Sequence, residues 1–184
     1  MNNVTILSFS PREAGNCTAT AEFIRAHLIE QISANVQICR VDNKTFPACG
    51  ECGYECLRPG ASCPTITTDQ RRILDSVCNS DLVYYIVPNF CGYPCANYFA
   101  FNERLVGYFG MDRVRRNQYL AVPKRFILIS NSKTEQFTEA MRQQTNSEPQ
   151  ILFLATGKYR RNSLAGDLMT SVEAQAELIS FLDG

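Results

Sequence analysis

Residues 4–18 of the chain read VTILSFSPREAGNCT, an apolar run that passes into hydroxyl residues, a glycine and a helix-periodic segment. The apolar run predicts a buried β-strand, and the turn behind it leads into a helix. The first amides of a helix have no partners within the helix, and the helix dipole favours an anion there. Strand, turn and helix start in this order predict a cradle for the phosphate of a bound ligand.

The composition fits one α/β domain of 184 residues, 45% of them hydrophobic. Lys and Arg number 18, as do Asp and Glu, so no field of one sign favours nucleic acid or an anionic membrane. No apolar run approaches the roughly 18 residues of a membrane span, and the N-terminus lacks the features of a signal peptide. We therefore expect a soluble, cytoplasmic protein that binds neither nucleic acid nor membranes.

Strand and helix patterns alternate along the chain with little left over. Apolar or alternating runs predict strands at residues 3–9, 36–41, 81–88, 124–131 and 150–155. Periodicity and capping residues predict helices at residues 19–32, 68–78, 96–109, 134–144 and 171–182. This alternation is typical of a doubly wound, five-stranded parallel sheet with helices on both faces. We find no repeat or linker, so a single domain is expected over residues 1–184.

The loop after the first strand offers several groups that suit a phosphate. Arg12 can form charge-assisted hydrogen bonds, and Gly15 allows close approach of the backbone. Asn16 and Thr18 carry further donors. The loop is neither a P-loop nor a dinucleotide fingerprint, because it lacks both the Gly-Lys-Ser/Thr ending and the three-glycine spacing. A helix start that is simply well capped is the structural alternative.

The segment Ser10-Pro11-Arg12-x-x-Gly15-Asn16 resembles the phosphate loop of the flavodoxin-like NAD(P)H-dependent FMN reductases. The resemblance extends over the whole chain and implies a flavodoxin-like fold, with FMN as cofactor and NAD(P)H as electron donor. It implies that the FMN phosphate is held by Ser10, Arg12, Asn16, Cys17 and Thr18. Cys17 departs from the family, which usually has a hydroxyl residue there. A thiol is a poor donor, so the backbone amide would have to make that contact.

Residues 46–65, after the second strand, form a long loop rich in cysteine, glycine and proline. Its compact spacing suits a metal ion or a cluster, with candidate ligands Cys49, Cys52, Cys56 and Cys63. The run is similar to that of the iron–sulfur flavoprotein branch of the same family, which has two residues where this chain has three between the second and third of these cysteines. Three interpretations stay open: a [4Fe–4S] cluster, a zinc ion, and thiols that bind no metal.

The loop after the third strand offers flat surfaces for a ring. Two prolines and a glycine fix this loop, and Phe90 and Tyr93 supply aromatic faces. In the family that the chain resembles, the corresponding loop lies against the isoalloxazine. The resemblance thus implies that the flavin contacts are Pro88, Asn89, Phe90 and Gly92. Ordinary loop packing is the alternative.

Three further features carry alternatives. Ser130 and Asn131, after the fourth strand, can hydrogen-bond the pyrimidine side of the ring or cap the next helix. Cys91 and Cys95 are helix-entry residues or a redox pair. The arginine-rich loop before the fourth strand, including Lys124, is expected to be a solvated surface, with a nicotinamide or subunit interface as the alternative.

Together these features predict an FMN-dependent oxidoreductase that takes electrons from NAD(P)H and reduces a small-molecule or protein acceptor. No side chain is assigned as a catalytic acid or base. His27, the one histidine, lies in the first predicted helix, which argues against a Ser-His-Asp hydrolase. In the iron–sulfur branch the cluster faces a flavin of another subunit, so the resemblance implies a homo-oligomer, a dimer or tetramer. The alternatives are a flavodoxin-type electron carrier and a metal or redox sensor built on the cysteine loop.

Overall fold

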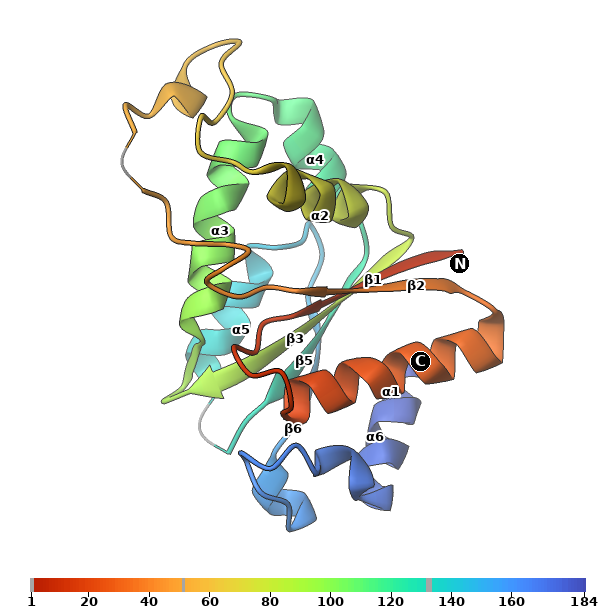
Figure 1. Cartoon of the computed structure of the whole chain (residues 1–184). Coiled ribbons are helices and arrows are strands. Elements are labelled where there is room, and N and C mark those ends of the chain that lie inside the picture. The colour runs from red at the N-terminus through yellow and green to blue at the C-terminus, as the bar shows by residue number, and fades with distance from the viewer. Residues whose placement is uncertain (1, 51, 132–133) are drawn as a thin grey trace.

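A computed structural model describes residues 2–50, 52–131 and 134–184. Its centre is a sheet of parallel strands in the order β2-β1-β3-β5-β6 (Figure 1). These strands are β1 (Asn3–Ser8), β2 (Asn35–Arg40), β3 (Leu82–Phe90), β5 (Lys124–Ile129) and β6 (Gln150–Leu154). A short strand, β4 (Tyr93–Pro94), adds an antiparallel pair to the end of β3. The five parallel strands predicted from the sequence are confirmed, and β4 is an addition.

Helices cover both faces of the sheet (Figure 1). One face is covered by α1 (Asn16–Ile32) and α6 (Val172–Asp183). The other carries α2 (Thr68–Cys78), α3 (Ala96–Phe109), α4 (Arg113–Ala121) and α5 (Glu135–Arg142). Single 3₁₀ turns form η1 (Glu55–Leu57), η2 (Thr156–Tyr159) and η3 (Leu168–Thr170). Within the described ranges no helix is long and apolar enough to cross a bilayer.

The central strand β3 shows how one apolar run serves two cores. Successive side chains of a strand point to opposite faces of the sheet. Tyr84 and Ile86 accordingly pack with α1 and α6, while Val83, Tyr85 and Val87 pack with the helices of the other face. All five are fully buried. A continuous apolar strand is therefore stable here, because both faces are covered.

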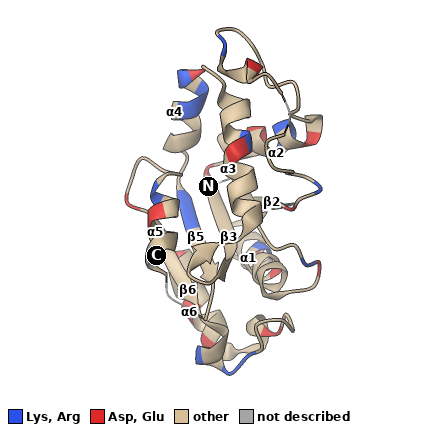
Figure 2. Cartoon of the chain, turned by 90° about the vertical axis from the view of Figure 1, so that its left-hand side faces the viewer, with Lys and Arg blue, Asp and Glu red and all other residues tan. Residues whose placement is uncertain are grey.

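Arg113 and Arg116 are exposed, as predicted for a solvated surface, but the segment is a helix rather than a loop, and Lys124 is not solvated. The arginines lie on the helix α4 (Figure 2), whose N-terminus is capped by Asp112, which accepts a hydrogen bond from the Arg115 amide at 3.0 Å. Tyr119 of α4 is 1% exposed and anchors the helix in the core. Lys124 is also buried, and its ammonium donates to the carbonyls of Tyr119 and Val122. Burial lowers the pKa of Lys124 to about 8.

Candidate functional site

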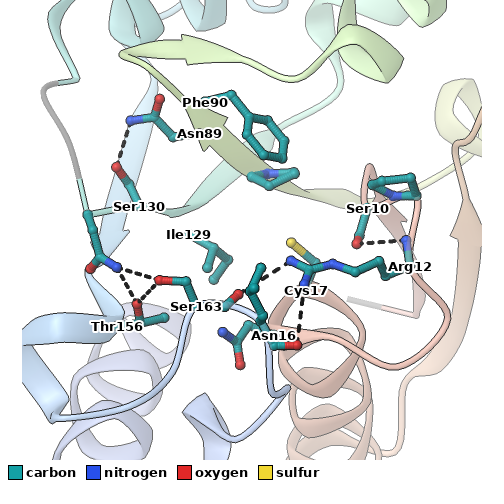
Figure 3. A pocket seen from close by; sticks show the side chains of 14 residues that line it. Ser10, Arg12, Asn16, Cys17, Asn89, Phe90, Ile129, Ser130, Thr156 and Ser163 are labelled. Atoms are coloured by element: carbon teal, nitrogen blue, oxygen red, sulfur yellow. Dashed lines mark hydrogen bonds between the residues drawn. The ribbon is translucent and has the colours of Figure 1, made fainter.

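A pocket of about 290 Å³ lies at the carboxyl ends of the parallel strands (Figure 3). It opens beside β1 and β3, where the order of the strands reverses and where open α/β sheets bind their ligands. All predicted flavin contacts except Thr18 and Gly92 line it, namely Ser10, Arg12, Asn16, Cys17, Pro88, Asn89, Phe90, Ser130 and Asn131. The sequence thus marks loops that are far apart in the chain and meet at one site.

The loop after β1 forms one end of this pocket. Gly15 precedes α1 in an extended conformation, and no described side chain caps the helix through a hydrogen bond. Ser10 is buried, and its Oγ accepts a hydrogen bond from the Arg12 amide at 3.2 Å. Thr18 lies outside the lining, where its hydroxyl donates to the Arg12 carbonyl at 3.4 Å. Thr18 therefore stabilises the conformation of the loop without facing the pocket.

Arg12 lies in the pocket and contacts a segment that sequence reasoning missed. We call this segment, residues 160–168, the strap. The Arg12 guanidinium donates to two strap carbonyls, those of Ser163 and Leu164, each at 3.3 Å. Half-buried, it is the only cationic side chain among the described residues of the lining. Its position gives this end of the pocket a positive charge.

Asn16 also contacts the strap, but through a buried side chain. Its side chain is 3% exposed, and Nδ2 donates to the carbonyl of Asn162 at 2.9 Å. Its Oδ1 accepts from the amide of Leu168 at 3.0 Å. Asn16 was predicted to contact the phosphate, but both polar groups of its side chain bind the strap instead.

The cysteines near the pocket occupy separate environments. Burial, reinforced by the nearby Cys95 thiol, raises the pKa of Cys17 and keeps it a neutral thiol. The Cys95 thiol donates to the Phe9 carbonyl at 3.3 Å, and burial raises its pKa to about 11. Cys91 is exposed. Cys95 directly precedes α3, as the helix-entry interpretation expects, whereas Cys91 lies in the turn between β3 and β4.

The loop after β3 is a hairpin formed with β4. Its two turn residues, Cys91 and Gly92, have φ angles of 54° and 92°, the pattern of a turn in which both central residues are left-handed. Asn89 Oδ1 accepts from the Gly92 amide at 2.9 Å, and Asn89 Nδ2 donates to Ser130 Oγ at 2.6 Å. Gly92 thus shapes the turn outside the lining. Phe90 is 55% exposed, with its ring at the pocket (Figure 3).

The far wall comes from the chain after β6. Asn131 Nδ2 donates to Thr156 Oγ1 and to Ser163 Oγ, both at 2.6 Å, and Asn131 Oδ1 accepts from the Gly157 amide at 2.8 Å. The lining residues missed from the sequence are Pro11, Ile129, Thr156, Ser163 and Leu164. Pro11, Ile129 and Thr156 have one sequence signal, their position at or soon after the end of a parallel strand, whereas Ser163 and Leu164 belong to the strap.

The cysteine loop lies at the opposite end of α3 from the pocket (Figure 1). Near the pocket, Asn97 donates to the Phe9 carbonyl at 3.1 Å. Farther along the helix, Gly107 faces Cys63, and a Cβ added there would lie 2.9 Å from its Sγ. From Asn97 to Gly107 the helix rises about 15 Å. The loop and the pocket are therefore separate sites in one chain.

A buried arginine holds the cysteine loop on α3. Arg104 is 4% exposed and donates to the carbonyls of Pro47 and Ala48 at 2.8 and 2.9 Å. Of the four candidate ligands, Cys56 and Cys63 are buried, Cys52 is half-buried and Cys49 is exposed. In the part of the chain that the structure describes, no three His, Cys, Asp or Glu side chains are grouped to hold a metal ion.

Comparison with known proteins shows the fold. No protein-family model and no curated protein matches the sequence. FerB, a flavoenzyme NAD(P)H:(acceptor) oxidoreductase from Paracoccus denitrificans, is 12% identical with a TM-score of 0.57, over 100% of this chain and 96% of that one. EMOB, an NADH:FMN oxidoreductase, is 14% identical with a TM-score of 0.59, over 98% and 88%. The Trp repressor binding protein from Bacillus subtilis is 11% identical with a TM-score of 0.61, over 98% and 97%. These similarities confirm the flavodoxin-like fold.

Proposed function

We propose that the protein is an FMN-dependent oxidoreductase that takes hydride from NAD(P)H and passes electrons to a small-molecule or protein acceptor. The observation that carries the proposal is the meeting of a cationic loop and an aromatic hairpin at one pocket, beside the reversal of the strand order. The similar folds of FerB, an NAD(P)H:(acceptor) oxidoreductase, and EMOB, an NADH:FMN oxidoreductase, add support. Once bound, FMN supplies the hydride acceptor and the electron store.

The two ends of the pocket suit the two ends of FMN. Arg12 and the first amides of α1 would bind the phosphate, since a guanidinium and a helix start both favour an anion. Phe90, Pro88 and Ile129 offer an apolar surface for the ring. Ser130, on the β5 side, is placed for the polar edge of the ring. In this proposal the Cys17 side chain makes no charged contact, because its thiol stays protonated.

The chain's own contribution is to position the reactants. Neither a carboxylate nor a histidine lines the pocket among the residues that are described, so no side chain is assigned as an acid or base. Protons for the acceptor would come from solvent through the open side of the pocket, where Phe90 is exposed. Catalysis would therefore depend on the geometry in which the ring and the nicotinamide are held.

The cysteine loop stays outside the proposed electron path. Its four thiols do not group as ligands in the described ranges, and the loop lies at the opposite end of α3 from the pocket. A [4Fe–4S] cluster or zinc at Cys49, Cys52, Cys56 and Cys63 therefore stays a prediction, as does the homo-oligomer that the resemblance implies. Iron, sulfide and zinc analysis of protein purified without oxygen tests the first, and sedimentation the second.

Anaerobic stopped-flow absorbance tests the proposal. Protein loaded with FMN is mixed with NADH or NADPH, and we expect the flavin absorbance to bleach in a saturable manner with at least one of them. Loading with FMN but no reduction by either nucleotide would favour an electron carrier instead. Failure of the purified protein to take up FMN would contradict the proposed cofactor itself.

A further inference from the structure

The strap is attached in two different ways to the loop after β1 and the first residue of α1. The first attachment is polar and weak, since the Arg12 guanidinium reaches the carbonyls of residues 163–164 at 3.3 Å in contacts open to solvent. The second is buried and shorter, and is made by both polar groups of Asn16 with Asn162 and Leu168. A ligand phosphate can displace the first attachment while the second stays in place.

A close backbone contact reinforces the buried attachment. Gly166 of the strap has a φ of 75°, a conformation that favours glycine. A Cβ at Gly166 would lie 3.3 Å from the Cα of Gly15 and 3.4 Å from its N and C atoms. The strap backbone therefore packs directly on the residue that precedes α1. An amide side chain at position 16 and a glycine at position 166 together allow this approach.

The charge distribution separates the roles of the two residues. A phosphate competes well for a guanidinium, because a charged pair replaces hydrogen bonds to neutral carbonyls. It competes poorly for Asn16, whose donor and acceptor are both satisfied at 2.9 and 3.0 Å in a side chain that is 3% exposed.

We infer that Asn16 is a positioning residue: it anchors the strap, which closes the phosphate end of the pocket, and it does not bind the phosphate itself. This inference rests on the proposed function, since the ligand whose release the strap slows is FMN. On binding, Arg12 exchanges the carbonyls of residues 163–164 for the phosphate, and the strap stays in place through Asn16 and Gly166. FMN would leave only when this anchor opens.

The test compares Asn16→Ala with Gly166→Ala, a change that cannot remove a ligand contact from Asn16. Hydrogen exchange of the strap amides, that of Leu168 above all, is measured in the FMN-free protein. Release of FMN is then followed by the recovery of its fluorescence. We expect each variant to speed strap exchange roughly tenfold and FMN release roughly three- to tenfold, because buried hydrogen bonds or a close packing contact are lost. The double variant should behave like either single variant.

Gly60→Ala is the matched control. Gly60 has a φ of 74°, and no atom lies within 4 Å of its added Cβ, so this variant carries the same backbone strain without the contact. It should leave the strap and FMN release unchanged. Strap exchange that is unchanged in Asn16→Ala, or FMN release that is unchanged when the strap is loosened, would overturn the inference. If wild-type protein binds no FMN, the proposed function fails, whereas strap exchange still tests the anchor.

Discussion

Replacement of Arg12 by alanine should weaken FMN binding without weakening riboflavin binding. Arg12 supplies the cationic side chain of the described pocket lining, and a hydrogen bond to a charged group contributes about 1.5–3 kcal/mol. To bind the phosphate, Arg12 must leave two contacts with strap carbonyls, each at 3.3 Å. The loss of each contact offsets at most about 0.5 kcal/mol of this gain in binding free energy. The net loss is about 0.5–2 kcal/mol, which is about 2- to 30-fold in the dissociation constant.

Titration of flavin fluorescence at constant ionic strength measures both ligands. Riboflavin has the same ring but no phosphate, so its affinity should be the same in wild type and Arg12→Ala. Arg25→Ala is the control, because Arg25 lies on α1 outside the pocket lining, where it is exposed and paired with Glu22 at 2.7 Å. An equal loss of affinity for FMN and riboflavin would contradict a phosphate contact, since Arg12 would then act on the pocket as a whole.

Two predictions concern stability. Lys124→Met removes an amine whose pKa is lowered by burial to about 8 from 10.5. Between these values the unfolded chain binds the proton that the folded chain lacks, so the free energy of unfolding of wild type should rise with pH relative to the variant, by at most roughly 1.4 kcal/mol per pH unit. Urea unfolding at pH 8, 9 and 10 measures this free energy for both proteins. The same change with pH in wild type and Lys124→Met would count against the prediction. Gly107→Ala places a Cβ 2.9 Å from Cys63 Sγ and should loosen the cysteine loop by roughly 1–3 kcal/mol. Limited proteolysis within residues 46–65 should quicken, whereas Gly50→Ala, which meets nothing within 4 Å, should not change it; equal cleavage rates would contradict the contact.

The sheet and most of the pocket lining could be predicted because both follow from local patterns. The apolar run of β3 reads as a strand covered on both faces, and Ser10 and Arg12 stand directly after a buried strand. Parallel strands bring such positions to one edge, so loops far apart in the sequence could be assigned to one site.

The helix α4 could not be predicted from its own composition. It is rich in arginine and has few apolar residues, as solvated loops do. Tyr119 secures it from within the core through a hydrogen bond of 2.5 Å with Tyr85 and one of 2.6 Å with Gln144. Tyr85 lies on β3 and Gln144 follows α5 in the chain, so the contacts that stabilise α4 are tertiary.

The strap was missed for a related reason. It has neither helical nor strand periodicity, and its attachments join residues about 150 positions apart, such as Asn16 and Leu168. Asn16 illustrates the consequence for site assignment. A polar residue in a phosphate loop reads as a ligand, yet its partners in the folded chain belong to the protein itself.

A crystal structure of the protein grown with FMN would locate the phosphate and the ring of the ligand. We expect the phosphate beside the Arg12 guanidinium and the start of α1, with the ring against Pro88 and Phe90. FMN bound at another surface, or bound in this pocket with the phosphate turned toward Phe90, would contradict this expectation.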